Sequence, residues 1–326
     1  MKHAVRSLVP VAIPLLLLGG IAAVVLQPAV PRTAAIPLSV KLQHLQGVAV
    51  AKFAQLPTFE KATAETPSIV EVYYGFGKLF PYAQADAITR QRALPLIELN
   101  PQHTELAAIA AGKYDSYLDA YAKATAAFRD PVVISFGHEM NGEWYSWGYR
   151  HTLPAVFVAA WRHIVSLFRG QDARNVIWLW TVNIGHPGNR QVSPIAPWWP
   201  GGSYVTWVGI DGYFRLPSDT FATLFGATFV QVRALTTKPV LITETAVAPG
   251  PAAAGQVASL FNGVRSYGML GYIWFDAVGT QDWRIEDDPP ALAAFRREAR
   301  TYSSAGSWPS RAERAHARRR PGTRRG

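Results

Sequence analysis

The feature that most constrains the fold is a repeated alternation of short apolar runs with longer Ala-rich segments. Continuous apolar strands that alternate with helices are typical of a parallel sheet covered on both faces. Eight such units predict a closed (β/α)8 TIM barrel that forms a single domain. The expected strands are Leu45–Val50, Ile69–Phe76, Ala93–Leu99, Val132–Phe136, Val176–Val182, Trp207–Tyr213, Val240–Thr245 and Gly271–Asp276. The expected helices are Tyr114–Phe128, Leu153–Phe168, Thr220–Leu235, Ala252–Tyr267 and Pro290–Tyr302.

An open doubly wound sheet is the alternative fold for this pattern. Dinucleotide-binding sheets of that kind carry a Gly-rich loop after the first strand, and none follows Leu45–Val50. We therefore expect one barrel domain over residues 41–303, preceded by a targeting segment and linker over residues 1–40. Residues 304–326 form an Arg-rich tail with little apolar content, which predicts disorder.

The formal charge of +10 at pH 7 is concentrated at the ends of the chain. Residues 311–326 hold seven Arg and one Glu, a contribution of +6, and Lys2 with Arg6 contributes +2. The remaining +2 is spread over the middle, which argues against a basic groove for nucleic acid. We expect no nucleic-acid partner, although binding of an anionic polymer by the tail stays open as an alternative.

The N-terminus is typical of a targeting segment. Lys2 and Arg6 precede an apolar stretch, Leu8–Leu26, that is long enough to cross a bilayer. Positive residues before such a stretch favour an orientation with the rest of the chain outside. The segment is either a membrane anchor or a cleaved signal peptide, for which Thr33–Ala35 offers a tolerable site. In both cases we expect export, with the folded domain secreted or held at the cell surface.

Two of the predicted strands end in a glutamate. The stretch Pro131–Gly148, PVVISFGHEMNGEWYSWG, changes from an apolar run to polar and aromatic residues around Glu139. The stretch Pro239–Ala246, PVLITETA, carries Glu244 at the end of its apolar run. In a (β/α)8 barrel the C-terminal ends of the strands form the active site. We therefore expect Glu139 and Glu244 to meet as a catalytic pair.

A glycosidic bond can be cleaved by two carboxyl groups that flank it in opposite protonation states. Aromatic neighbours of Glu139 should desolvate it and raise its pKa, so that it can donate a proton. Hydroxyl neighbours of Glu244 should hydrogen-bond it and keep it ionised. These neighbours are Phe136, Trp144 and Trp147 for Glu139, and Thr243 and Thr245 for Glu244. The plainer alternative is that each glutamate is a salt-bridge partner at a strand end.

Other chemistries find little support in the sequence. The chain has no Cys, which excludes thiol and zinc–thiolate sites. The pair His138-Glu139 lacks the second His of a metalloprotease motif, because Gly142 stands at that spacing. We expect neither a metal nor a cofactor, and a monomeric protein.

Taken together, these segments resemble glycoside hydrolase family 26, within the clan of retaining (β/α)8 glycosidases. The resemblance runs from about residue 47 to residue 302, and HEMNG followed by Trp is its most specific element. The matching segments are HEMNGEWYSW at 138–147, WPGGSYVTWVGIDGY at 199–213, PVLITETA at 239–246, GYIWFDA at 271–277 and DWRIEDDPPALAAFR at 282–296.

The resemblance implies a role for each of several residues. Glu139 would be the general acid/base, and Glu244 the nucleophile that forms a covalent glycosyl-enzyme intermediate. Tyr213 would donate a hydrogen bond to Glu244. The residues expected to line the sugar are His138 at the cleavage point, Trp144 on the leaving side, Trp274 as a floor under the attacked sugar, and, less directly, Asn141 and Trp147. For His138 a structural role stays open as an alternative. Trp274 could likewise be an indole that packs in the barrel wall.

The chain departs from the family pattern around the site. Ser135 stands where members usually carry an Arg, and Asn100 ends the third strand where an acidic residue is common. Gly202 and Thr206 replace aspartates of the segment before strand six. These changes leave the carboxyl pair intact but open the question of the substrate.

The function that the resemblance implies is a retaining endo-β-glycanase that acts on a polysaccharide, with β-1,4-mannan as the first expectation. A β-glucanase or β-xylanase of the same family is the alternative, as is a non-catalytic glycan-binding protein on a hydrolase barrel. The long segment Gly185–Gly202 contains Trp198 and Trp199, which either contact substrate or pin the loop to the barrel wall.

Overall fold

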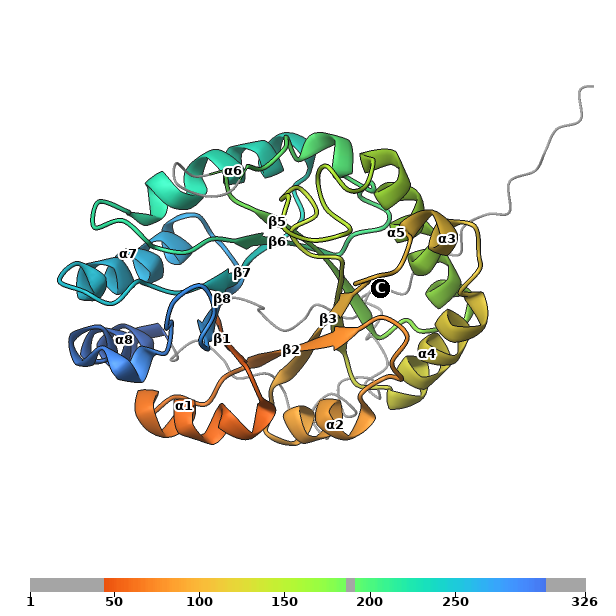
Figure 1. The fold of residues 1–326 in the computed structure, drawn as a ribbon. Helices are drawn as coiled ribbons and strands as arrows, with labels where there is room; N and C mark the ends of the chain where they lie inside the picture. The colour runs from red at the N-terminus through yellow and green to blue at the C-terminus, as the bar shows by residue number, and fades with distance from the viewer. Residues whose placement is uncertain (1–43, 186–190, 303–326) are drawn as a thin grey trace, which may run out of the picture. The chain divides into compact units, whose positions relative to one another are not determined.

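The computed structural model describes residues 44–185 and 191–302, which form a closed barrel of parallel strands in the order β1 to β8. Each strand pairs with the next along the chain, and β8 pairs with β1 to close the ring (Figure 1). The predicted TIM barrel is confirmed and the open sheet is excluded. The strands are β1 Leu45–Val50, β2 Ile69–Gly75, β3 Leu94–Asn100, β4 Val132–Phe136, β5 Val176–Asn183, β6 Trp207–Asp211, β7 Val240–Thr245 and β8 Gly271–Asp276.

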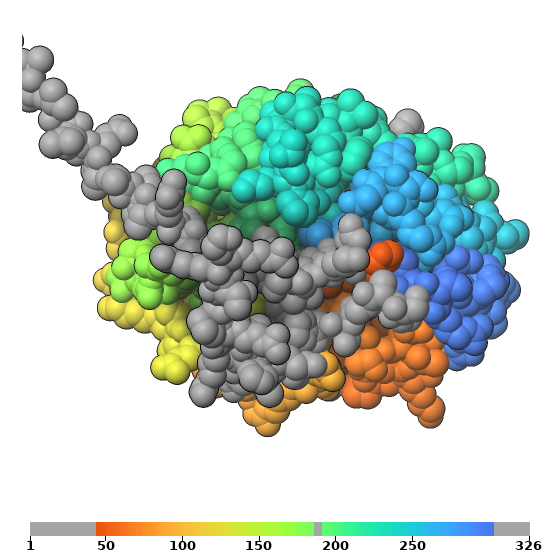
Figure 2. Space-filling view, turned by 180° about the vertical axis from the view of Figure 1, so that it is seen from behind, coloured from red at the N-terminus to blue at the C-terminus, as the bar shows by residue number. Residues whose placement is uncertain are grey.

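Helices surround the barrel, and the last of them lies beside the first, α8 next to α1 (Figure 2). The sequence pattern predicted the five long helices but not α1, α2 and α3, which are too short for a clear helical periodicity. The helices are α1 Leu56–Thr63, α2 Tyr82–Arg90, α3 Leu106–Ala110, α4 Asp115–Phe128, α5 Pro154–Gly170, α6 Phe221–Leu235, α7 Ala253–Ser266 and α8 Pro289–Tyr302. Short 3-10 turns occur at Phe53–Gln55, Ala196–Trp198 and Ile285–Asp287.

The apolar core has two parts, because side chains alternate between the two faces of each strand. Residues on the outer face pack against the helices in one large cluster. Residues on the inner face fill the lower half of the barrel with aliphatic side chains and one indole, and they include Leu96, Val133, Leu179, Trp207 and Leu241. Two residues further along β3, β4, β5 and β7 the inner face becomes polar, with Glu98, Ser135, Thr181 and Thr243. The apolar filling of the barrel interior therefore ends where the candidate site begins.

The tryptophans of the loop between β5 and β6 pin the loop rather than line an open face. Trp198 is buried and donates from Nε1 to the Ser193 hydroxyl at 2.8 Å. Trp199 packs edge-on against Trp180 with ring centroids 5.0 Å apart. The alternative that these two tryptophans pin the loop to the barrel wall is therefore confirmed.

Two predictions lie outside the described residues, namely the targeting segment over residues 1–40 and the tail over residues 304–326. Within the ranges that the structure does describe, no helix combines the length and the apolarity needed to cross a membrane.

Candidate active site

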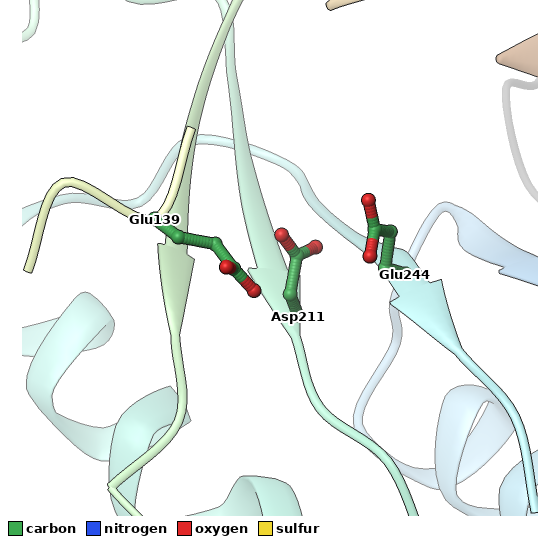
Figure 3. Close-up of side chains that lie close together, drawn as sticks. All are labelled: Glu139, Asp211 and Glu244. Atoms are coloured by element: carbon green, nitrogen blue, oxygen red, sulfur yellow. The ribbon is translucent and has the colours of Figure 1, made fainter. Parts of the chain in front are cut away.

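Glu139 lies just after β4, where the backbone turns sharply. Gly137 and Glu139 have positive φ values of 58° and 52°, a conformation that residues other than glycine seldom adopt. The Glu139 amide donates to the carbonyl of Thr181 on β5 at 3.0 Å, which fixes the turn. Strained non-glycine residues of this kind cluster at functional sites. The turn directs the Glu139 side chain over the C-terminal ends of the strands (Figure 3).

Glu244 reaches the barrel interior through an irregularity in β7. Ile210 of β6 pairs with Ile242, but the next residue, Asp211, pairs with Glu244. The extra residue, Thr243, forms a β-bulge, and a bulge changes the direction of the side chains around it. In a regular strand Thr243 and Glu244 would face opposite sides of the sheet. Here both point inward, since Thr243 donates to Asp211 at 2.5 Å while Glu244 accepts hydrogen bonds across the barrel.

Three carboxyl groups converge at the mouth of the barrel. Figure 3 shows Glu139, Asp211 and Glu244 pointing toward one another, Glu139 from the turn after β4, Asp211 from β6 and Glu244 from β7. One oxygen of each carboxyl lies within 4.8 Å of those of the other two. All three side chains are buried. The two glutamates that were expected to meet do so, with Asp211 between them.

Both carboxyl oxygens of Glu139 accept a hydrogen bond from an N–H group. Trp144 donates from Nε1 to Oε2 at 2.5 Å, and Asn183 donates from its amide to Oε1. Trp144 therefore acts on Glu139 as a hydrogen-bond donor as well as an apolar neighbour. Trp147, the other indole expected beside Glu139, stacks instead on the Tyr145 ring with ring centroids 4.3 Å apart.

Both carboxyl oxygens of Glu244 accept a hydrogen bond from a phenol. Tyr213 donates to Oε2 and Tyr73 to Oε1, each at 2.5 Å. The predicted contact with Tyr213 is confirmed. The predicted support from the neighbouring threonines is wrong: Thr243 bonds Asp211, and no partner in the described chain reaches the Thr245 hydroxyl.

The protonation of Glu244 also differs from expectation. Burial and the nearby Glu139 raise the pKa of Glu244 to about 7, against the lowering effect of His138, Tyr213 and Tyr73. Burial and the charge of Glu244 likewise raise the pKa of Asp211 well above its usual range. The expectation that its surroundings simply keep Glu244 ionised therefore needs correction, because several buried carboxyls share one site.

His138 is buried, and both of its ring nitrogens have polar partners. Nδ1 lies 3.0 Å from Asn100 Oδ1 and 3.0 Å from Glu98 Oε2, and Nε2 lies 3.0 Å from the Tyr145 hydroxyl. Burial alone would lower the pKa of His138, but Glu98 outweighs it and the pKa rises to about 9. These contacts show that His138 has a structural role, which was the alternative left open for this residue.

Asn141 and Trp147 support the loop rather than face the site. The Asn141 amide donates to the Asn183 carbonyl at 2.8 Å and accepts from the Asn183 amide at 2.9 Å. Trp147 is 1% exposed, donates to the His138 carbonyl at 2.8 Å and stacks on Tyr145 with centroids 4.3 Å apart. The expectation that Trp147 contacts substrate is therefore wrong.

Trp274 is a second correction. It is fully buried and lies on the outer face of β8, where it packs edge-on against Phe295 of α8 at 5.5 Å. Its Nε1 donates to the Trp283 carbonyl at 3.2 Å. Strand alternation gives the inner face of β8 to Ile273 and Phe275 instead. Trp274 is the barrel-wall indole of the alternative interpretation and cannot form a floor under a sugar.

Three residues of the site were missed by sequence reasoning: Tyr73, Asn183 and Asp211. Each lies near the end of the inward-facing row of its strand: Tyr73 follows Glu71 on β2, Asn183 follows Thr181 on β5, and Asp211 follows Trp207 and Gly209 on β6. The alternation of side chains between the two faces of a strand, applied to the end of every predicted strand, would have identified them. They matter because two of them hold the catalytic candidates by hydrogen bonds and the third lies between the candidates.

The oxygens of Glu139 and Glu244 are already engaged by Trp, Asn and Tyr donors. This arrangement orients two carboxyl groups toward the same small space. It suits proton transfer to an atom between them and attack on a neighbouring carbon.

Comparisons with known proteins agree on one family. A family model described as glycosyl hydrolase family 26 matches residues 106–285. Endoglucanase H of Acetivibrio thermocellus is 30% identical over 265 residues, which are 76% of this chain but 29% of that protein. A beta-1,3-xylanase of an Alcaligenes species is 26% identical over 172 residues, which are 49% of this chain and 35% of the relative.

A solved structure shares the fold. The endo-beta-1,4-mannanase double mutant of Cellulomonas fimi superposes with a TM-score of 0.59 at 19% identity, over 79% of this chain and 70% of that one. The family match covers more than half of the residues, and the barrel carries its two strand-end glutamates within it. The chain belongs to glycosyl hydrolase family 26.

Proposed function

We propose that the protein is a retaining endo-β-glycanase, with Glu139 as general acid/base and Glu244 as nucleophile. The observation that supports this most is the spacing of the two carboxyl groups, whose nearest oxygens lie within 4.8 Å. Retaining enzymes hold the two groups about 5 to 5.5 Å apart, whereas inverting enzymes leave about 6.5 to 9.5 Å for a water molecule.

The reaction would proceed in two displacements. Glu139 donates its proton to the glycosidic oxygen while an oxygen of Glu244 attacks the anomeric carbon, so that the bond to the leaving sugar breaks. The product is a glycosyl ester of Glu244. Glu139, now ionised, takes a proton from water, and the hydroxide oxygen displaces Glu244 from the carbon. Both carboxyl groups return to their initial states.

The hydrogen bonds around each glutamate support these roles. Tyr73 and Tyr213 hold both oxygens of Glu244 and favour its ionised form, as a nucleophile requires. Asn183 and Trp144 fix the Glu139 carboxyl in one orientation, which is what proton transfer to a defined atom requires. Trp144 is half-buried, so part of its ring remains available to a sugar on the leaving side.

β-1,4-Mannan is the first substrate to test, since the solved structure described above is a mannanase that shares this fold. A β-glucan is the second candidate. It is favoured by the match to Endoglucanase H of Acetivibrio thermocellus, which covers 76% of this chain. The match to a beta-1,3-xylanase adds β-1,3-xylan as a third. Hydrolysis of a panel of these polysaccharides, followed by the anomeric configuration of the first product, tests substrate and mechanism together.

Two variants separate the roles of the glutamates. Glu244→Ala should abolish hydrolysis of every substrate while the barrel stays folded by circular dichroism. Glu139→Ala should lose hydrolysis of polysaccharide but keep much of its first step on an aryl glycoside whose leaving group needs no proton. Added azide should then give a glycosyl azide. Hydrolysis that survives Glu244→Ala, or products with inverted configuration, would refute the assignment.

Export and a monomeric state are proposed on sequence grounds. The apolar stretch Leu8–Leu26 with positive residues before it supports secretion or anchoring with the barrel outside the cell. Fractionation of expressing cells, with N-terminal sequencing of the mature protein, distinguishes an anchor from a cleaved signal. A chain lacking residues 311–326 should hydrolyse as well as the full chain. If it instead loses glycan or polyanion binding without any loss of hydrolysis, the tail has a separate role.

A further inference from the structure

Beneath the catalytic candidates the barrel interior holds more buried acid than the mechanism uses. Together with the two candidates, five carboxyl groups are buried inside the barrel, each 8% exposed or less: those of Glu71, Glu98, Glu139, Asp211 and Glu244. Within the described part of the chain, His138 is the only basic side chain that forms an ion pair with any of them. Five ionised carboxylates with one cation would repel one another strongly in a medium that solvates them poorly. Some of these groups must therefore hold protons.

Glu71 is the clearest case. It lies on β2, two residues before Tyr73 and on the same inward face, and it is fully buried. No donor in the described chain reaches either of its carboxyl oxygens. The next inward-facing carboxyl on β3 is that of Glu98, which lies opposite Tyr73 in the register of the two strands, and its charge helps to raise the pKa of Glu71. Two buried neighbouring carboxyl groups repel each other when both are ionised, so a shared proton stabilises the pair.

Glu98 is in turn the partner of His138. Its Oε2 lies 3.0 Å from His138 Nδ1, which also faces Asn100 Oδ1 at 3.0 Å. A ring nitrogen that faces two oxygens carries a hydrogen. On the other side of the ring, Nε2 lies 3.0 Å from the Tyr145 hydroxyl, an oxygen that can accept a second N–H. Both ring nitrogens thus have acceptors, as a protonated imidazole requires.

The groups around this row explain which of its members are charged. Burial and the charges of Glu244, Glu98 and Asp211 raise the pKa of Glu71 well above its usual range. His138 is faced by Glu98 from β3, by Glu139 from its own loop and by Glu244 from β7, and Tyr73 packs edge-on against its ring at 6.2 Å. All of these carboxylates favour the imidazolium. The imidazolium in turn lowers the pKa of Glu244, together with Tyr213 and Tyr73.

We propose that Glu71, Glu98 and His138 form a buried proton-sharing row, in which protonated Glu71 donates to ionised Glu98, and Glu98 keeps His138 positively charged beside Glu244. The row makes His138 the cation that favours the ionised nucleophile, and it makes Glu71 and Glu98 positioning residues. The link to catalysis rests on the proposed role of Glu244, but the charge of His138 can be measured without substrate.

The decisive measurement is the titration of His138 in the full chain labelled with ¹³C-histidine. Its signal is assigned by its loss in His138→Gln. In the wild type it should remain protonated up to about pH 8, in keeping with a pKa of about 9. Glu98→Gln replaces the carboxylate by an amide of nearly the same size. The signal should then titrate below about pH 7, because burial is no longer opposed by that charge.

Glu71→Gln is the matched control, because its amide can still donate to Glu98, so the His138 signal should stay protonated as in the wild type. The acidic limb of kcat/KM should move to higher pH in Glu98→Gln and stay in place in Glu71→Gln. If the limb moves by one pH unit, the kcat/KM of Glu98→Gln is about ten-fold below that of the wild type at any pH on that limb.

A neutral His138 at pH 7 in the wild type would overturn the inference, even if a variant failed to fold. Equal shifts of the His138 pKa in Glu98→Gln and Glu71→Gln would contradict the proposal that Glu71 and Glu98 share a proton. An absence of hydrolysis on every polysaccharide, with the titrations as expected, would refute the proposed function and leave the row in place.

Discussion

Each of the two catalytic candidates is held at both carboxyl oxygens, but by donors of different kinds. Indole and amide N–H groups hold Glu139, whereas two phenols hold Glu244. A hydrogen bond to a carboxylate favours its charged form. The phenols therefore oppose the burial and the repulsion from Glu139 that raise the pKa of Glu244 to about 7.

Removing either phenol hydroxyl should weaken the nucleophile. In Tyr213→Phe and in Tyr73→Phe we expect kcat to fall by about 100-fold, as for loss of one oriented donor. The acidic limb of kcat/KM should move to higher pH, because the pKa of Glu244 rises when a donor to its charged form is lost. The measurement is a pH–rate profile of each variant.

The adjacent residue on β2 provides the control for that prediction. Tyr74 points to the outer face and bonds Gln84, so Tyr74→Phe should leave the profile unchanged. A profile of Tyr213→Phe that coincides with that of Tyr74→Phe would show that the phenols do not tune Glu244.

Among the elements, β7 and β8 decide the geometry of the site. The bulge at Thr243 brings Glu244 to the inner face. The pairing of β8 with β1 closes the ring, so that the ends of β4 and β7 face each other across a fixed distance. This closure depends on Gly271, where an added Cβ would lie 1.9 Å from the Leu45 carbonyl oxygen.

Gly271→Ala should therefore destabilise the closure of the barrel. The clash is with backbone, which cannot move aside without breaking the first pairs between β8 and β1. We expect a lower Tm and faster hydrogen exchange in β1 and β8. Gly255→Ala in α7 is the matched control, because a Cβ there meets nothing within 4 Å. It should be neutral or stabilise by up to about 1 kcal/mol. Similar exchange in the two variants would contradict the role of Gly271.

At the scale of the whole barrel, the buried acids make stability depend on pH in an unusual direction. A carboxyl whose pKa is higher in the folded state binds more protons folded than unfolded between the two pKa values. The free energy of unfolding must then fall as pH rises through that interval. Glu244 and Asp276 have pKa values of about 7 against 4.5 and 3.8, raised chiefly by burial. His138, at about 9 against 6.5, adds stability that is lost between those values as pH rises.

All three groups therefore predict a protein that is most stable in mild acid. Tm should be highest near pH 5 and should fall through pH 7 to pH 9, by about 2 to 4 °C for each kcal/mol lost. Calorimetry across that range checks it. Glu244→Gln should flatten the part of the curve below pH 7, because it removes one of the titrating groups. A Tm that rises from pH 5 to pH 7 would contradict the raised pKa values.

The sequence by itself determined the barrel and the pair of glutamates. Five to eight residues of alternating or continuous apolar character fix a strand locally, and the observed strands differ from the predicted ones by no more than two residues at any end. Strand ends of a parallel barrel meet at one rim, so Glu139 and Glu244 could be brought together without coordinates.

The tertiary structure alone decided which way individual side chains face and what they contact. Trp274 lies on the outer face of its strand, and Thr243 turns to Asp211, because parity and a one-residue bulge are set by pairing with neighbouring strands. The same holds for Tyr73, whose bond to Glu244 spans 171 residues of sequence. Local patterns specify elements, whereas contacts across the barrel depend on the register of all eight strands at once.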